Sequence, residues 1–292
     1  MSILAETERR LKIPESLISQ LYHLAAFKTR KRGTRVEKGM LITSIDIDVG
    51  SSQVGLRNKG RNDANVHQVL SERMVGQIEE TALPLFVDMF ETLDMPVTFA
   101  LRGQCLDIDT TAIEVLLGSS VKHDIGSHGY THRRFGDLSA SEAETEFDMI
   151  SAAMKRCGVF PTSFVFPQDS VAHLNLLEKF GYKSYRSFGS FFHDRMQLEK
   201  QGALYNICPS LHLTRSANAL FLKKLLDIAV AKRSPFHIWF HLWNFGYDME
   251  SIQRSVKRAV FPLLQYAKEK VNVGVLTFET MFSVVEKIER SG

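Results

Sequence analysis

Residues 40–50 of the chain have the sequence MLITSIDIDVG, and their pattern is the starting point for predicting the fold. Residues 40–47 form a mostly apolar run, which predicts a strand that is buried on both faces. Similar short runs recur between segments of helical periodicity, at residues 96–101, 123–128, 163–167, 182–187, 236–241 and 271–278. Strands that alternate with helices predict a parallel sheet, and about seven such units predict either a barrel or a doubly wound sheet.

The segments between these strands have the apolar periodicity of helices. The clearest helix start is Ser139, because Glu142 three residues later completes a capping box. The predicted helices span residues 71–93, 110–117, 139–156, 171–181, 217–233 and 252–269, with one more at the C-terminal end. A polar loop at 50–68 is long enough to indicate a functional loop, and residues 188–213 follow no regular pattern.

Composition indicates a globular protein with a large core, since 44% of the 292 residues are apolar and 24% are charged. The net charge of +3 is too small to predict nucleic-acid binding. The three cysteines are widely spaced, which favours buried thiols over disulfides or a zinc cluster. Neither a secretory signal nor an apolar stretch of about 18 residues is found, so we expect a cytoplasmic protein without a transmembrane segment.

The first 38 residues are predicted to form a helical extension that ends in a basic arm. Leu17, Leu21, Leu24 and Phe27 recur at helical spacing, and the arm at 28–38 begins with the run KTRKRGTR. The arm is weakly compatible with contact to an anionic membrane surface, although a solvated charged segment is the simpler interpretation. One larger domain is predicted over residues 39–292.

Polar residues at the ends of predicted strands are the candidates for chemistry, because parallel sheets concentrate function at the carboxyl ends of their strands. Asp46 and Asp48 alternate with Ile47, so both carboxylates project from one face of the first strand. A buried pair of like charges needs a cation or hydrogen-bond donors between them. Solvated aspartates at a strand end remain the alternative interpretation.

Two histidines follow the strand at 123–128, in the sequence SHGYTH. The four-residue spacing of His128 and His132 predicts two imidazoles on one side of a helical turn, which suits two corners of a tetrahedral zinc site. Such pairs also arise by chance in a chain with ten histidines. Gly126 and Gly129 strengthen the metal interpretation, because they permit a turn that a core helix would not adopt.

A distant histidine, His241, stands at the end of the strand at 236–241, and His237 lies on the same face. We select His241 because of its terminal position, while a hydrogen-bonded core histidine is the alternative for either residue. Two histidines and one carboxylate would hold a metal with positions open for water and substrate. A second carboxylate and the distant histidine would then be available as general base and general acid.

The order of these segments resembles the polysaccharide deacetylase family, the NodB-homology domains of carbohydrate esterase family 4. SIDIDVG resembles the family's T-F-D-D-G motif, SHGYTH its H-[ST]-x-x-H motif, FVFPQ its R-x-P-Y motif and IWFH its late histidine motif. The resemblance covers residues 40–285. It implies a distorted (β/α) barrel of about seven parallel strands as the catalytic domain, with the N-terminal helix as an addition.

The resemblance implies a metal-dependent hydrolase that removes an acetyl group from an N-acetylated sugar. Asp48, His128 and His132 would hold one divalent ion, with zinc as the first choice and cobalt, nickel or manganese as alternatives. Asp46 would be the general base for a metal-bound water, and His241 the general acid. The candidate substrate-binding residues are Pro167, Gln168, Arg186, Trp243 and Asn244, with the backbone N–H of Gln168 as the oxyanion donor by family position. Trp243 and Asn244 are included because aromatic faces stack on sugar rings, and core packing is an equal alternative for this segment.

The chain departs from the family motifs at several positions. Ile47 separates aspartates that are adjacent in the family, so the base and the ligand could be exchanged. Val165 and Gln168 stand where the family has Arg and Tyr, and Arg186 from the neighbouring strand could supply the missing guanidinium. A motif containing Asp and Trp has no clear counterpart.

Two further functions stay open from the sequence. One is hydrolysis of a non-sugar amide, as in the allantoinase-like relatives of this fold. The other is a carbohydrate-binding relative that has lost catalysis. The sequence does not identify the sugar, the metal or the oligomeric state.

Overall fold

The computed structural model describes residues 25, 36–48, 81–187, 198–213, 217–246 and 248–291 of the chain. Several predicted features lie outside these residues. They are nearly all of the extension 1–38 with its helix and most of its basic arm, the polar loop 50–68, the first part of the helix at 71–93 and part of the region 188–213. The domain boundary after residue 38 therefore stays a prediction.

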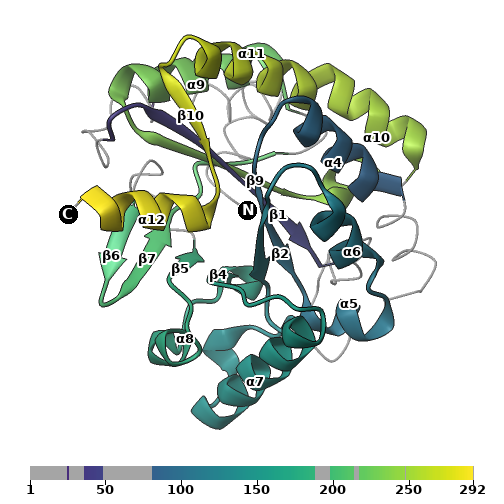
Figure 1. The fold of residues 1–292 in the computed structure, drawn as a ribbon, viewed down its shortest axis with the longest axis vertical. Helices are drawn as coiled ribbons and strands as arrows, with labels where there is room; N and C mark the ends of the chain where they lie inside the picture. Colours follow the sequence, from purple (N-terminus) through teal and green to yellow (C-terminus); the bar gives the residue numbers. More distant parts are fainter. Residues whose placement is uncertain are drawn as a thin grey trace, which may run out of the picture.

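Within the described ranges, ten strands form one mostly parallel sheet that curls into a half-barrel (Figure 1). All pairs are parallel except the hairpin of β6 and β7. In sheet order the strands are β6 (Leu198–Gln201), β7 (Leu204–Ile207), β5 (Ser184–Arg186), β4 (Ser163–Val165), β3 (Asp124–Ser127), β2 (Thr98–Leu101), β1 (Gly39–Ile47), β9 (Pro235–His241) and β8 (Leu211–His212), and β10 (Leu276–Glu279) pairs with the first half of β1.

The described helices are, in chain order, α4 (Leu83–Thr92), α5 (Gly103–Ile108), α6 (Thr111–Gly118), α7 (Ala140–Arg156), α8 (Leu174–Lys179), α9 (Ala219–Lys232), α10 (Met249–Ser255), α11 (Phe261–Asn272) and α12 (Met281–Ser291). All of them except α12 lie around the outside of the curled sheet (Figure 1). A π-helical turn at Val256–Val260 joins α10 to α11. Ser139 caps α7 with the capping box that the sequence predicts.

The strand β1 is buried along its whole length and presents different residues to the two faces of the sheet. Leu41, Ile45 and Ile47 pack into the main core beneath the helices. Met40 and Ile42 belong to a separate cluster on the other face, in register with the two aspartates farther along the strand. The predicted placement of Asp46 and Asp48 on one face, opposite Ile45 and Ile47, is therefore confirmed.

The helix α12 covers the inside of the half-barrel at the amino ends of its strands. Met281, Val284 and Val285 pack against the inner cluster that includes Met40 and Ile42. The helix begins at the sheet, since the N–H of Met281 donates to the hydroxyl of Thr98 at 2.8 Å. One end of the half-barrel is thereby filled with side chains, and the other end remains for a site.

The predicted distorted (β/α) barrel is confirmed, and all seven predicted strands are present. The strand predicted at 271–278 begins too early, because α11 continues to Asn272 and β10 starts at Leu276. The strands β6, β7 and β8 and the helix α5 were not predicted. Three of the four residues of β6 are exposed, so this edge strand lacks the apolar run that marks a buried one.

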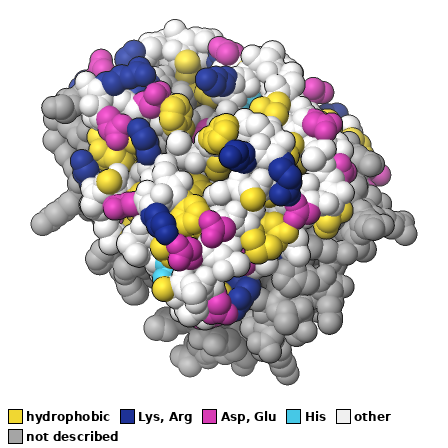
Figure 2. Space-filling model, turned by 60° about the horizontal axis from the view of Figure 1, so that its bottom comes forward, with side chains coloured by type: hydrophobic (Ala, Val, Ile, Leu, Met, Phe, Trp, Pro, Cys, Tyr) yellow, Lys and Arg dark blue, Asp and Glu magenta, His cyan; other side chains and the backbone are white. Residues whose placement is uncertain are grey.

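Figure 2 brings the lower part of Figure 1 forward and shows acidic and basic side chains intermixed on this face. Among the described residues, Lys179 forms an ion pair with Glu144, and Arg133 forms one with Glu142. No single-sign region appears on the described surface in this view. None of the described helices combines the length and apolar character that crossing a bilayer requires.

Candidate active site

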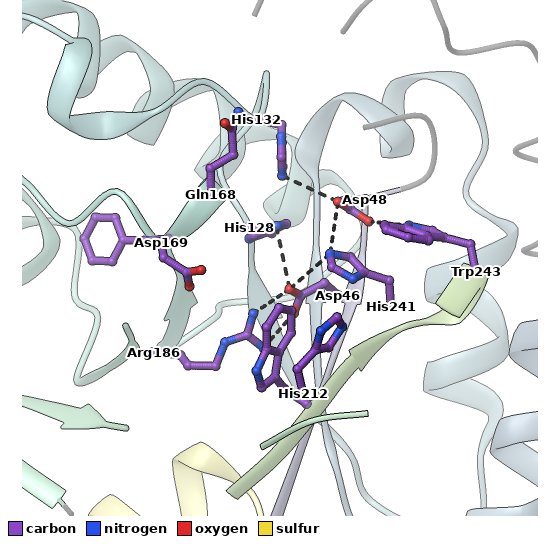
Figure 3. A pocket seen from close by; sticks show the side chains of 12 residues that line it. Asp46, Asp48, His128, His132, Gln168, Asp169, Arg186, His212, His241 and Trp243 are labelled. Carbon is purple, nitrogen blue, oxygen red and sulfur yellow. Dashed lines mark hydrogen bonds and ion pairs between the residues drawn. The ribbon is translucent and has the colours of Figure 1, made fainter. Parts of the chain in front are cut away.

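The carboxyl ends of the parallel strands surround a cavity of about 240 Å³ (Figure 3). Parallel strands end at the same edge, so segments far apart in the sequence meet there. The lining includes every predicted site residue except Pro167 and Asn244, each of which is next in sequence to a lining residue. The lining consists of Asp46, Asp48, His128, His132, Phe166, Gln168, Asp169, Arg186, His212, Trp239, His241 and Trp243.

Asp46, near the end of β1, is held by a guanidinium from β5. Arg186 donates from Nη1 to Oδ1 at 2.8 Å and from Nη2 to Oδ2 at 2.5 Å. Burial raises the pKa of Asp46, but Arg186, with smaller contributions from His128 and His241, lowers it well below its usual value. Two-point pairing also fixes the plane of the carboxylate, so Asp46 is an ionised acceptor in a defined orientation.

Arg186 is oriented in turn by polar groups behind it. Its Nη1 also donates to the hydroxyl oxygen of Ser44 at 2.7 Å, and that oxygen lies 2.8 Å from Nε2 of His237. Nδ1 of His237 lies 3.0 Å from the carbonyl oxygen of Ile207, which only accepts, so Nδ1 carries the proton. Burial and then Arg186 lower the pKa of His237 to about 3. His237 is therefore a neutral residue that orients the guanidinium through Ser44.

Asp48, His128 and His132 form a compact, buried set of metal-ligand side chains. One ligand atom of each lies within 4.8 Å of those of the other two. Nε2 of His132 is 3.5 Å from Oδ2 of Asp48. That distance is close to the roughly 3.4 Å edge of a tetrahedron whose metal–ligand bonds are about 2.1 Å long. Figure 3 shows His132 and Asp48 directed toward one another, with His128 beside them.

The turn that carries the two histidines is not helical, which corrects the sequence prediction. Gly129 and His132 both have φ of +67°, in the left-handed region. This conformation suits glycine, whereas it strains His132 by roughly 1–2 kcal/mol. Two left-handed residues, and not a helical turn, bring the imidazole centroids to 4.8 Å from each other.

The backbone of this turn is held by two helices. Glu146 of α7, which is buried, accepts hydrogen bonds from the N–H groups of Tyr130 and Thr131 at 3.0 and 2.9 Å and from the Thr131 hydroxyl at 2.5 Å. From the other side, the N–H of Gln104 in α5 donates to the carbonyl oxygen of Tyr130 at 3.1 Å. The strained turn persists because these bonds satisfy its backbone groups in one conformation.

Burial keeps both histidines of the turn neutral. It lowers the pKa of His128 below its usual value and that of His132 to about 3. Nδ1 of His128 lies 2.8 Å from the carbonyl oxygen of Val165 and therefore carries the proton. Nε2 of His128 then presents a free lone pair to the cavity, the usual state of an imidazole that binds a metal.

The donor set fits a divalent cation. Two neutral imidazoles and one carboxylate are ligands that zinc accepts in catalytic sites while coordination positions stay open. The charge of Asp48 is buried beside these neutral rings, and a cation there would offset the cost of removing the charge from water. The guanidinium of Arg186 is hydrogen-bonded to Asp46, so the position beside Asp48 is available to a metal ion.

His241 ends β9 and faces both aspartates. Its Nε2 is 3.5 Å from Oδ2 of Asp48 and 3.8 Å from Oδ2 of Asp46. Oδ1 of Asn244 accepts from the backbone N–H of His241 at 2.7 Å and lies 3.2 Å from its Nδ1. The ring of Trp243 stacks on His241 at 4.4 Å, and its Nε1 donates to Asp48 at 3.3 Å. The side-chain amide of Asn244 therefore contacts both the backbone and the ring of His241.

The segment after β4 forms the wall near His132. Pro167 is buried, and Gln168 and Asp169 have φ of +52° and +55°. Both of these residues line the cavity, and Figure 3 shows the carboxylate of Asp169 directed into it. Asp169 was not predicted from the sequence, although a charged residue directly after the buried run of β4 was an available signal.

Two other lining residues were also missed. His212 lies on the two-residue strand β8, inside the region without a regular pattern. Trp239 lies two residues before His241 on β9, where the sequence favours interpreting an aromatic residue as part of the core. The two rings stack with centroids 4.1 Å apart, and Trp239 also covers the Arg186 guanidinium at 4.5 Å.

A comparison with family models matches residues 75–185 to the polysaccharide deacetylase family. The matched segment contains both histidines of the turn and Pro167. Asp46, Asp48 and His241 lie outside it and reach the same cavity through the fold. A comparison with curated proteins returned no match.

Solved structures share the fold across most of their length. A Mycobacterium smegmatis protein assigned to the polysaccharide deacetylases has a TM-score of 0.66 at 13% identity, over 90% of this chain and 95% of that chain. Puue allantoinase has a TM-score of 0.63 at 13% identity, over 88% and 93%. A Pseudomonas aeruginosa PAO1 protein, also assigned to the polysaccharide deacetylases, has 0.60 at 12%, over 86% and 91%. At these identities the likeness shows the fold alone.

Proposed function

We propose that the chain, which belongs to the polysaccharide deacetylase family, is a metal-dependent hydrolase that removes an acetyl group from an N-acetylated sugar. The observation that supports this most is the meeting of Asp48, His128 and His132 in one cavity with a second carboxylate and a distant histidine. A hydrolase of this family acts on the C–N bond of an amide.

The geometry supports distinct roles for the two aspartates. Asp48 belongs to the compact ligand set, whereas both oxygens of Asp46 are paired with Arg186. We therefore assign Asp48 as a metal ligand with the two histidines, and Asp46 as the general base. The opposite assignment would require the metal to compete with a buried two-point ion pair for Asp46.

A divalent ion bound here would polarise the acetyl carbonyl and lower the pKa of water toward 7. Oδ2 of Asp46 would accept the proton of the attacking water, and Arg186 would keep that oxygen in place. Nε2 of His241, with its ring fixed by Asn244 and Trp243, would donate a proton to the leaving nitrogen. The backbone N–H of Gln168 is the proposed donor to the developing oxyanion.

Zinc is the metal that we propose first, with cobalt, nickel or manganese as alternatives, because the set combines two nitrogen ligands and one oxygen ligand. Elemental analysis of the purified protein is expected to find about one divalent ion per chain. Removal by a chelator should abolish turnover, and one of these ions should restore it.

Acetate release from neutral N-acetylglucosamine oligosaccharides tests the sugar substrate directly. The metal-loaded protein is expected to release acetate, and the variant His128→Ala serves as the inactive control. Metal bound at full occupancy with no acetate released from any N-acetylated sugar would exclude the proposed substrate class.

The allantoinase-like alternative is tested in the same panel, because the fold likeness to Puue allantoinase does not distinguish the two activities. Turnover of allantoin without acetate release would favour that alternative. Tight binding of the oligosaccharide without turnover, in fully metallated protein, would favour the inactive carbohydrate-binding relative.

A further inference from the structure

A third carboxylate in the cavity, that of Asp169, has no part in the scheme above. It comes from the segment after β4, whereas Trp243 comes from the segment after β9, and both side chains line the same cavity (Figure 3). Asp46 lies in β1 and pairs with Arg186, and Asp48, directly after β1, lies close to His132 and His241. Asp169 is therefore a separate acidic group on the cavity wall.

The backbone fixes the direction of this carboxylate at a cost in strain. Gln168 and Asp169 are adjacent non-glycine residues in the left-handed region, each of which is unfavourable by roughly 1–2 kcal/mol. Hydrogen bonds hold the turn, from the N–H of Asp169 to the carbonyl of Phe166 and from the N–H of Ser170 to the carbonyl of Pro167, both at 3.1 Å. Strain of this kind is typical of ligand-binding segments.

The carboxylate of Asp169 is largely removed from water without a hydrogen-bond donor from the described part of the chain. Burial raises its pKa to about 6, against the smaller opposing effect of Arg186. Arg186 gives its hydrogen bonds to Asp46 and Ser44. A carboxylate in this position gains when a ligand supplies the missing donors.

We propose that Asp169 is a substrate-binding residue that accepts hydrogen bonds from hydroxyl groups of a neutral N-acetylated sugar and selects against acidic sugars. This inference rests on the proposed function and narrows its substrate class. An ionised carboxylate has two oxygens that accept from neighbouring hydroxyls, and it repels a carboxylate or phosphate on the ligand. Among the described lining residues the sole Lys or Arg is Arg186, which already pairs with Asp46.

The test compares wild-type protein with Asp169→Asn on a matched pair of substrates. One is the N-acetylglucosamine tetramer, and the other is the same tetramer oxidised to the carboxylate at C6. Rates are divided by the rate on 4-nitrophenyl acetate, which carries no sugar and reports on the catalytic groups alone. We expect kcat/KM for the neutral tetramer to fall about tenfold, chiefly through KM, while that for the acidic tetramer stays equal or rises.

The variant Asp137→Asn is the matched control, since Asp137 is exposed and pairs with Arg134 outside the cavity. It is expected to leave the preference for the neutral tetramer unchanged. Equal changes of both substrates in Asp169→Asn, or no change in either, would overturn the assignment.

A binding measurement separates failure of this inference from failure of the proposed function. Calorimetry with the neutral tetramer is expected to give a Kd about tenfold weaker for Asp169→Asn than for the wild type. If the wild type binds the tetramer about tenfold more tightly than Asp169→Asn but releases no acetate, the proposed function fails while the binding role of Asp169 is supported. If the Kd values of the two proteins agree, the binding role fails whatever the activity.

Discussion

Two aspartates at opposite ends of one sheet, the buried Asp46 and the partly buried Asp124, have different partners. Asp46, near the carboxyl end of β1, pairs with the guanidinium of Arg186. Asp124, at the amino end of β3, has no cation among the partners of its carboxylate in the described chain. Its Oδ2 accepts from the hydroxyls of Thr98 at 2.9 Å and Ser163 at 2.7 Å and from the N–H of Phe282 at 3.1 Å.

The partners shift the two carboxyl groups in opposite directions. Burial raises the pKa of both, but at Asp46 the Arg186 guanidinium, together with His128 and His241, offsets burial and the pKa is lowered. At Asp124 the three neutral donors do not offset burial, and the pKa stays raised. Asp124 joins β2, β3, β4 and α12 to one another, whereas Asp46 maintains a charge beside the cavity. The amino end of the half-barrel thus provides stability, and the carboxyl end provides chemistry.

Loss of a metal ligand is expected to have the largest effect on the carboxyl end. His128→Ala should abolish stoichiometric metal binding and lower kcat/KM for acetate release by about 10⁴, because several kcal/mol of transition-state stabilisation would be lost. Elemental analysis and the acetate assay measure the two effects. His173→Gln, which changes a histidine bonded to the carbonyl of Leu138, is the control. Full metal binding by His128→Ala would remove this residue from the ligand set.

The same substitution at the two aspartates tests the comparison directly, beginning with Asp46→Asn. Without the carboxylate, the buried Arg186 guanidinium loses its counter-charge, which should destabilise the protein by roughly 3 kcal/mol. Turnover should fall by on the order of 10² to 10³ because the base is lost, with metal still bound. Chemical denaturation of the metal-free protein and acetate release of the loaded protein provide the readouts. Unchanged stability would show that Arg186 has another counter-charge.

Part of this site could be predicted from the sequence, because polar residues interrupt apolar runs at strand ends. Asp46, Asp48 and His241 stand out for that reason, and parallel topology brings them to one edge. Arg186 was predicted from the resemblance to replace the guanidinium that orients the base, and the structure pairs it with Asp46, 140 positions away in the sequence. The contact depends on how β5 and β1 face each other across the half-barrel.

The remaining features depend on tertiary contacts that local sequence does not encode. The turn of SHGYTH looks helical by spacing, yet Glu146 and α5 hold it in a left-handed form. Asp169 reaches the cavity through two left-handed residues that propensity would not predict. The hairpin of β6 and β7 was missed because β6 is mostly exposed and polar, so no apolar run marks it.

Substitutions of Glu146 test whether metal binding at the carboxyl end of the half-barrel depends on supporting hydrogen bonds as well as on charged side chains. Glu146→Ala removes three acceptor contacts from the turn and should weaken the affinity for Co²⁺ or Zn²⁺ by about 10- to 100-fold. Glu146→Gln should bind metal nearly as well as the wild type, because the amide oxygen can accept both N–H groups while the Thr131 hydroxyl accepts from the amide nitrogen. Chelator competition measures both Kd values.

The exposed ion-pair residue on the same helix provides the control for Glu146. Glu144→Ala removes the contact to Lys179 and should leave the metal Kd unchanged. The absorption spectrum of the Co²⁺ form adds a readout of coordination geometry, which a general loss of stability would not shift. Wild-type metal affinity in folded Glu146→Ala would mean that the turn keeps its shape without this residue.

The smallest effect is expected from Asp124→Asn, the counterpart of Asp46→Asn at the amino end. An asparagine oxygen in the place of Oδ2 retains all three donors, so stability should change by no more than about 1 kcal/mol. Because the folded pKa of Asp124 is raised, its contribution is full below the unfolded pKa and is lost as the pH rises through the folded pKa. The stability of the variant relative to the wild type should therefore increase from acidic to neutral pH. Denaturation curves at several pH values measure this difference, and the opposite slope would mean that a cation stabilises Asp124 as Arg186 stabilises Asp46.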